Sequence, residues 1–244
     1  MPRFFLSEQT ISDNFLVLTG ENAAHARVLR LKRGDEVIVC DGSGTDCRCT
    51  ISDVSSGQIS LVVHDRAPSS TEPDVRCSVY MAFAKSDKLE HVIQKATELG
   101  AAEVIAFPSA RCVSRPDAKS LRTRLERWQK IAASAAAQCG RGRIPQVLAL
   151  DSYEAAIKRA AGCDLGLFPY ENEQQLTLRA ALAAKPFRTV SIVTGPEGGF
   201  TPEEVQLAAR HGLRICTLGP RILRCETAPL CALTAVLFSA GALD

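Results

Sequence analysis

The chain has 244 residues, of which 46% are hydrophobic and 23% are charged, and its formal net charge is +2. This composition is typical of a soluble globular protein and excludes a disordered or collagen-like chain, and the length allows one large domain or two smaller ones. None of the ten cysteines forms a C-x-x-C pair, which argues against a zinc site and predicts free thiols in a reducing cytosol. The N-terminus has too short an apolar part for a secretory signal, and the apolar run over 228–243 is too short to span a bilayer. We therefore expect a cytoplasmic protein with no metal and no membrane anchor.

Residues 1–70 are predicted to form a small β-rich domain. The strand-like runs are 4–6, 15–18, 36–40, 47–54 and 59–63. A helical pattern covers 21–31, and Asp41-Gly42-Ser43-Gly44 is a turn signal. Short strands with turns about every eight to twelve residues are typical of a small barrel. The segment 67–74, which contains two prolines and two serines, is predicted to be a linker.

From Val75 onward the apolar runs become nearly continuous, which is typical of strands buried on both faces. These runs are 79–83, 104–107, 165–168, 190–193 and 215–218. Helical periodicity lies between them, over 88–99 with Gly100 as a C-cap and over 121–138. The alternation of strand and helix predicts a second domain over 71–244, an α/β fold with a parallel sheet and helices on both of its faces.

The charge is unevenly distributed along the chain. Residues 111–143 contain nine Lys or Arg and only two Asp or Glu, a local excess of seven positive charges (9 − 2). Such a stretch is a candidate surface for a polyanion, and it is equally consistent with the solvated face of a long helix.

Two glycine loops follow the last two predicted strands, and the carboxyl ends of such strands are where open α/β sheets bind ligands. The first loop, 195–199 (GPEGG), precedes Thr201 and Glu204, which predict a capping box, and Pro202 at the first helical position. Glycines let the backbone approach a ligand closely. Because this loop carries Glu197 and no Lys or Arg, we expect a nucleoside or a ligand with a positive centre rather than a phosphate. The alternative is a pair of tight turns with a purely structural role.

The second loop runs from Leu218 to Thr227 and reads LGPRILRCET. Its charged residues Arg224 and Glu226 are interleaved with apolar ones, just before an apolar helix in which Thr227 is a candidate N-cap. The structural interpretation is an ion pair between Arg224 and Glu226, since such groups are buried only when paired. The functional interpretation is a polar pair that faces a substrate beside the cofactor.

Four groups of motifs occur in consistent order over nearly the whole chain. They are Arg3-Phe4-Phe5 with His25 to Arg30, Lys85-Ser86-Asp87-Lys88-Leu89-Glu90 with Gln94 to Gly100, Trp128 with Ala135 to Pro145, and GPEGG with LGPRILRCETA. Together they resemble the ribosomal RNA small subunit methyltransferase E family of the SPOUT superfamily. The resemblance implies S-adenosylmethionine as cofactor and methylation of N3 of a specific uridine, the family target uridine 1498, in 16S rRNA. It also implies a SPOUT-type parallel sheet with a C-terminal trefoil knot at the cofactor site, and a PUA-like β-barrel at the N-terminus.

The resemblance also assigns roles to residues and partners. Arg224 is expected to stabilise negative charge on a uracil oxygen, and Glu226 is expected to act as a base or to orient Arg224. The predicted cofactor contacts are Thr194, Gly195, Glu197, Gly199, Leu218, Gly219, Ile222, Leu223 and Thr227. The predicted RNA contacts are Arg3, Arg27, Arg30, Lys85, Lys88, Lys95, Arg111, Arg127, Gln138 and Arg141. The implied partners are 16S rRNA within the small ribosomal subunit and a second copy of the chain, joined through the final helix in a homodimer.

Three alternatives remain open from the sequence. One is a SPOUT methyltransferase that acts on ribose 2′-O or on tRNA. Another is a non-catalytic RNA-binding assembly factor that keeps a relic cofactor loop. The third, a nucleotide-binding oxidoreductase, is disfavoured because the G-x-G-x-x-G dinucleotide fingerprint is missing.

Overall fold

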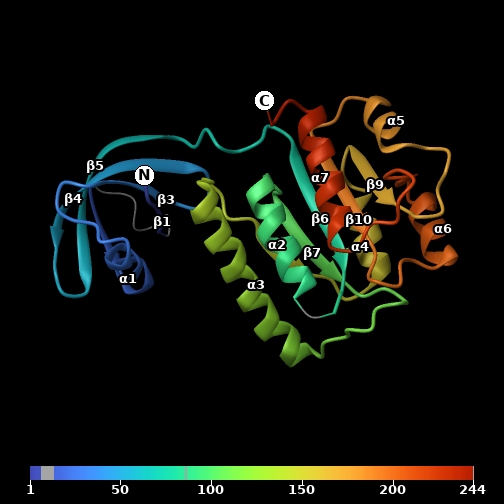
Figure 1. Ribbon diagram of the computed structural model, residues 1–244, viewed down its shortest axis with the longest axis horizontal. Coiled ribbons are helices and arrows are strands. Elements are labelled where there is room, and N and C mark those ends of the chain that lie inside the picture. The colour runs from blue at the N-terminus through green and yellow to red at the C-terminus, as the bar shows by residue number, and fades with distance from the viewer. Residues whose placement is uncertain (7–13, 86, 244) are drawn as a thin grey trace. The chain divides into compact units, whose positions relative to one another are not determined.

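The structure is a computed structural model that describes residues 1–6, 14–85 and 87–243 (Figure 1). The chain divides into two compact units, Met1–Glu72 with Ala136–Ile144, and Pro73–Ala135 with Pro145–Asp244. The segment Ala136–Ile144 was expected in the second domain but belongs to the first unit. Hydrogen bonds explain this, because the Glu72 carboxylate accepts from the Gly142 and Arg143 amides, both at 3.0 Å.

The first unit contains a curled five-stranded sheet in the order β1-β3-β4-β5-β2. Its elements are β1 Arg3–Phe5, β2 Phe15–Thr19, α1 Gly20–Val28, β3 Glu36–Cys40, β4 Thr45–Val54 and β5 Gln58–Pro68. β1 pairs with β3 in parallel, and the other neighbours are antiparallel. β1 and β2 are the two edges, so the described strands form an open half-barrel where a small barrel was expected.

The core of this unit is filled by apolar side chains that alternate with more exposed ones along the strands. Side chains two positions apart, Leu16 and Leu18 in β2 and Cys47, Cys49 and Ile51 in β4, are buried in one cluster with Phe4. The expected linker begins later than predicted, because Ala67 and Pro68 still pair with β4 as the end of β5.

The second unit contains a six-stranded parallel sheet in the order β11-β9-β10-β6-β7-β8, which confirms the predicted α/β class. Its strands are β6 Arg76–Ala82, β7 Glu103–Phe107, β8 Gln146–Ala149, β9 Leu165–Pro169, β10 Thr189–Thr194 and β11 Arg214–Cys216. The helices between them are α2 Lys88–Leu99, α3 Ala118–Cys139, α4 Tyr153–Ala160, α5 Leu178–Ala183, α6 Pro202–Arg210 and α7 Thr227–Ser239, with the last turn of α3 in the first unit.

Helices cover the central strands of this sheet (Figure 1). α2 and α7 contact each other, and α7 packs against β6 and β10. α4 contacts the same two strands, and the Ser191 hydroxyl of β10 donates to the Ala160 carbonyl of α4 at 2.8 Å. Within a single chain, α7 is buried on one side only. Leu233 and Leu237 are buried, whereas Cys231 is exposed and Phe238 is 70% exposed, because they lie on the side turned away from the sheet.

All ten cysteines are free thiols. The described residues contain no group of three or more side chains suited to hold a metal ion. Across the same part of the chain, no helix combines the length and the apolar character that a membrane crossing requires.

Candidate functional site

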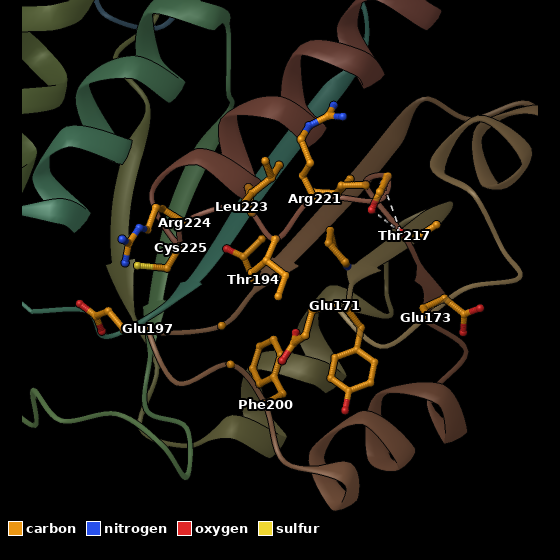
Figure 2. Close-up of a pocket in the computed structure, with 18 of the residues that line it drawn as sticks. Glu171, Glu173, Thr194, Glu197, Phe200, Thr217, Arg221, Leu223, Arg224 and Cys225 are labelled. Atoms are coloured by element: carbon orange, nitrogen blue, oxygen red, sulfur yellow. Dashed lines mark hydrogen bonds between the residues drawn. The ribbon is translucent and has the colours of Figure 1, made fainter.

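A cavity of about 960 Å³ opens in the second unit at the carboxyl edge of the sheet. The neighbouring strands β9, β10 and β11 end there, at Pro169, Thr194 and Cys216. The loops that follow these strands form the walls (Figure 2). The site therefore lies where parallel α/β sheets bind ligands.

The first glycine loop is tightly folded. The Gly199 amide donates to the Pro196 carbonyl at 2.9 Å, and Gly199 adopts a φ of +65°. A Cβ at Gly195 would lie 3.2 Å from the Gly199 backbone, so the turn leaves no space for a side chain there. The predicted capping box between Thr201 and Glu204 is present, with Pro202 at the helix start.

Lys88 joins this loop to the second one. Its Nζ lies 3.4 Å from the Glu197 carboxylate in the first loop and 3.4 Å from the Glu226 carboxylate at the start of α7. The Lys85 amide donates to Glu197 at 3.0 Å, and the Cys225 sulfur lies 3.7 Å from Lys88 Nζ. The N-terminal end of α2 thus holds two loops that are far apart in sequence.

The protonation states of this cluster follow from its surroundings. Burial alone would raise the pKa of Glu197 and of Glu226, but hydrogen bonds and the Lys88 charge hold both pKa values below the ordinary 4.5. Partial burial opposes the charge on Lys88, yet Cys225 and the two carboxylates raise its pKa above 10.5. Burial raises the pKa of the Cys225 thiol to about 11. At neutral pH the cluster is therefore one cation between two anions beside a protonated thiol.

The structure contradicts an ion pair between Arg224 and Glu226, because none joins them in the described part of the chain and Glu226 pairs with Lys88 instead. Arg224 is exposed, and its carbonyl accepts from the Thr227 and Ala228 amides at 2.9 and 3.0 Å. Thr227 does not cap α7. Glu226 occupies the N-cap position with a helical backbone, so Thr227 already lies in the first turn.

The cavity brings together most of the residues expected at the cofactor site. Those that line it are Thr194, Gly195, Glu197, Gly199, Leu218, Gly219, Ile222, Leu223 and the expected catalytic Arg224. Thr227 and Glu226 are not among the lining residues. Lys88, expected as an RNA contact, lines the cavity, and so do three residues that we did not single out from the sequence, Tyr170, Glu171 and Glu173. The sequence could have indicated these three residues, because they follow the predicted strand 165–168 at its carboxyl end.

In the first unit, two expected RNA contacts are turned inward. Arg3 pairs with Asp46, and Arg141 pairs with Glu72 at 2.6 Å, and both arginines are buried. Their guanidinium groups are therefore shielded from an RNA phosphate, and we do not retain them as contacts. Arg27, Arg30 and Gln138 are exposed.

In the second unit, the expected RNA contacts lie nearer the surface. Lys85, Arg111 and Arg127 are exposed, and Lys95 is partly exposed. Arg127 pairs with Glu90 at 2.5 Å and Lys95 with Glu98 at 2.8 Å. Arg111 donates to the Gly198 carbonyl at 2.9 Å, which places a cation beside the first glycine loop. Ser86 lies outside the described residues.

Comparisons with known proteins agree with this geometry. A family model for an RNA methyltransferase domain matches residues 71–237, and one for an RNA methyltransferase PUA domain matches residues 18–63. The ribosomal RNA small subunit methyltransferase E of Bacillus subtilis (strain 168) is 36% identical over 98% of this chain and 96% of its own. The Mycobacterium tuberculosis (strain CDC 1551 / Oshkosh) protein of that name is 33% identical over 90% of this chain and 85% of its own. The structure of the Neisseria gonorrhoeae protein of that name, bound to S-adenosyl methionine, has a TM-score of 0.86 at 29% identity and covers 98% of this chain and 97% of its own.

Proposed function

Because this chain belongs to the ribosomal RNA small subunit methyltransferase E family, we propose that it uses S-adenosylmethionine to methylate N3 of one uridine in 16S rRNA. The observation that carries the proposal is the exposed Arg224 at the wall of a cavity built from both glycine loops (Figure 2). The names of the relatives support rRNA of the small subunit as the substrate, and the N. gonorrhoeae structure supports the cofactor.

The cavity has the properties that this cofactor requires. Its walls combine the apolar side chains of Leu218 and Leu223 with the backbone of two glycine loops, and its volume is that of a small-molecule site. The first loop carries Glu197 and no Lys or Arg, and the cations that line the cavity, Lys88, Arg221 and Arg224, come from α2 and from the second loop. When bound, the cofactor supplies a methyl group on a positively charged sulfur.

The chemical difficulty lies on the substrate, since uracil N3 carries a proton at neutral pH. Loss of that proton to solvent water leaves negative charge on the ring and its carbonyl oxygens. The guanidinium of Arg224 makes no ion pair or hydrogen bond with any other residue that the structure describes, so its donors are free to bind such an oxygen. A donor held by the bound substrate where negative charge develops supplies electrostatic stabilisation, which is usually the largest single term in catalysis. In this proposal Arg224 therefore contributes the largest part of the rate enhancement.

Glu226 has a smaller part. It is ionised at neutral pH and able to accept a proton, but its lowered pKa makes it a weak base. Its contact with Lys88 also fixes the N-cap of α7, and Arg224 lies only two residues before this N-cap. We therefore propose that Glu226 chiefly positions the loop that carries Arg224.

The RNA partner would meet the exposed basic residues. Contacts from Lys85, Arg111 and Arg127 to phosphates would make affinity fall with salt while adding little sequence selectivity. The uracil must leave its stack for N3 to reach the cavity, so the substrate base is proposed to be flipped out.

We further propose that the protein is a cytoplasmic homodimer and that the segment around both glycine loops forms a trefoil knot. The exposed side of α7, with Cys231 and the 70% exposed Phe238, supports the dimer, because an apolar helix face of this kind is stable when covered. The family membership supports the knot.

The test is to incubate the purified protein with methyl-labelled S-adenosylmethionine and with either naked 16S rRNA or 30S subunits, then to identify the modified nucleoside by mass spectrometry. We expect 3-methyluridine at a single position. A 2′-O-methylated nucleoside would refute the proposed reaction, and calorimetry that finds no cofactor binding would support a non-catalytic assembly factor.

A further inference from the structure

Three carboxylates line the cavity, and two of them are already satisfied by the protein. Glu173 accepts from the Gln175 and Leu176 amides at 2.7 and 3.1 Å, and Glu197 is held by Lys85 and Lys88. The third, Glu171, has neither a hydrogen bond nor an ion pair to any other residue that the structure describes. Glu171 is therefore the one cavity carboxylate, of these three, that is left for a ligand.

The position of Glu171 supports this role. It follows β9 and lies against the first glycine loop, with its Oε1 only 2.6 Å from the point that a Cβ on Gly199 would occupy. Figure 2 shows its side chain among the cavity residues, on the side of Phe200. A residue larger than glycine at 199 would displace this carboxylate, so the loop and the acid are matched in shape.

The Glu171 side chain is exposed at the cavity wall, so it is accessible to a ligand. A bound ligand that displaces water from the cavity lowers the effective dielectric between this carboxylate and a cation, which strengthens their attraction. We propose that Glu171 binds a cationic group of the cofactor. This inference rests on the proposed use of S-adenosylmethionine, which carries two such groups, the sulfonium and the α-ammonium. The charge of the cofactor, and not only its adenosine, then contributes to recognition.

The two sources of positive charge have different consequences. A contact with the sulfonium favours the cofactor over S-adenosylhomocysteine, which has lost that charge, and so promotes product release. A contact with the ammonium holds cofactor and product alike, and discriminates only against ligands without the amino acid part.

The experiment measures binding by calorimetry to the full-length protein and to its Glu171→Gln variant. The probes are S-adenosylmethionine with both charges, S-adenosylhomocysteine with the ammonium alone, and 5′-methylthioadenosine with neither. We expect the variant to lose about tenfold in affinity for S-adenosylmethionine, the size of one charged hydrogen bond, and to bind methylthioadenosine unchanged. If the variant also loses affinity for S-adenosylhomocysteine, the ammonium is the group that Glu171 binds. If its affinity for S-adenosylhomocysteine is unchanged, that group is the sulfonium.

The matched control is Glu203→Gln, which removes the same charge from the exposed first turn of α6, outside the cavity lining. Thermal melts without ligand verify that both variants fold. An equal loss for all three probes, or no loss for any, overturns the inference. Failure of the wild-type protein to bind S-adenosylmethionine would instead refute the proposed function, so the two failures are distinguishable.

Discussion

Lys88 Nζ and the Glu226 carboxylate lie 3.4 Å apart, although the two residues are 138 positions apart in the chain. The same ammonium lies 3.4 Å from Glu197, so one side chain on α2 holds both loops of the cavity. The three side chains are 27–28% exposed, which leaves them partly shielded from water and salt. The geometry of the cofactor site thus depends on a helix that lies outside both glycine loops.

Replacement of Lys88 by methionine is expected to loosen this arrangement. Two carboxylates lose their shared cation, and we expect a cost of about 1 kcal/mol, which corresponds to a fall in Tm of roughly 2–4 °C. The affinity for the cofactor should fall together with the stability, because both loops line the cavity. Lys88→Arg keeps the charge and is expected to retain most of the stability. Equal Tm and equal cofactor affinity in all three proteins would show that the contacts have no structural effect.

The pH dependence of this effect has a definite sign. Folding lowers the pKa values of Glu197 and Glu226, so their stabilisation is present above pH 4.5 and is lost as the pH falls through the lowered values. Folding raises the pKa of Lys88, so its contribution is present below pH 10.5 and is lost as the pH rises through the raised value. Urea titrations should therefore give a constant difference in unfolding free energy between wild type and Lys88→Met from pH 4.5 to pH 10.5. The difference should shrink at more acidic and at more alkaline pH. A difference that grows toward acid would contradict this assignment.

Arg224 is expected to act on the rate and not on cofactor binding. Arg224→Ala should lower kcat by about 100- to 1,000-fold, the usual cost of removing one donor to a developing oxyanion, with little change in the Kd for S-adenosylmethionine. Arg224→Lys keeps the charge but lacks the planar guanidinium, so its kcat should lie between those of the wild type and of Arg224→Ala. Arg179→Ala, on the exposed side of α5, is the control. Near-full turnover by Arg224→Ala would exclude the proposed role.

Arg30 adopts a left-handed backbone conformation, with a φ of +57°, just after α1. Because this conformation strains a residue that has a Cβ, Arg30→Gly should stabilise the protein by about 0.5–1 kcal/mol and still weaken RNA binding. Arg27→Gly removes the same charge from within α1 and should instead cost about 1 kcal/mol. Thermal melts and RNA titrations of both variants separate the two effects. Unchanged RNA affinity in Arg30→Gly would show that Arg30 is not one of the RNA contacts predicted from the sequence.

Phe238 tests the proposed dimer. The side chain is 70% exposed on α7, so Phe238→Glu should leave the fold intact and shift the mass in light scattering from dimer to monomer. Val113→Glu introduces the same charge at a 67% exposed position outside α7 and should not change the mass. A monomeric wild-type protein would refute the dimer outright.

Local patterns in the sequence predicted the regular elements of the second unit well. Apolar periodicity and a glycine C-cap located α2 at its observed bounds, and Gly100 has the left-handed φ of +110° that this role requires. The helices α4 and α5 were not predicted, because eight and six residues give only about two turns or fewer of helical periodicity. The four-residue strand β8 was not predicted either.

The sequence by itself determined the two glycine loops, the capping box at Thr201 and the placement of both loops at the ends of parallel strands, since each depends on residues close together in the chain. Only the tertiary structure decided which charges meet. It paired Glu226 with Lys88 instead of Arg224, buried Arg141 against Glu72, and left Glu171 open to the cavity. The physical reason is the distance along the chain over which each kind of interaction acts. Capping and periodicity act over a few residues, whereas an ion pair forms wherever folding brings opposite charges together, and no local pattern records that distance.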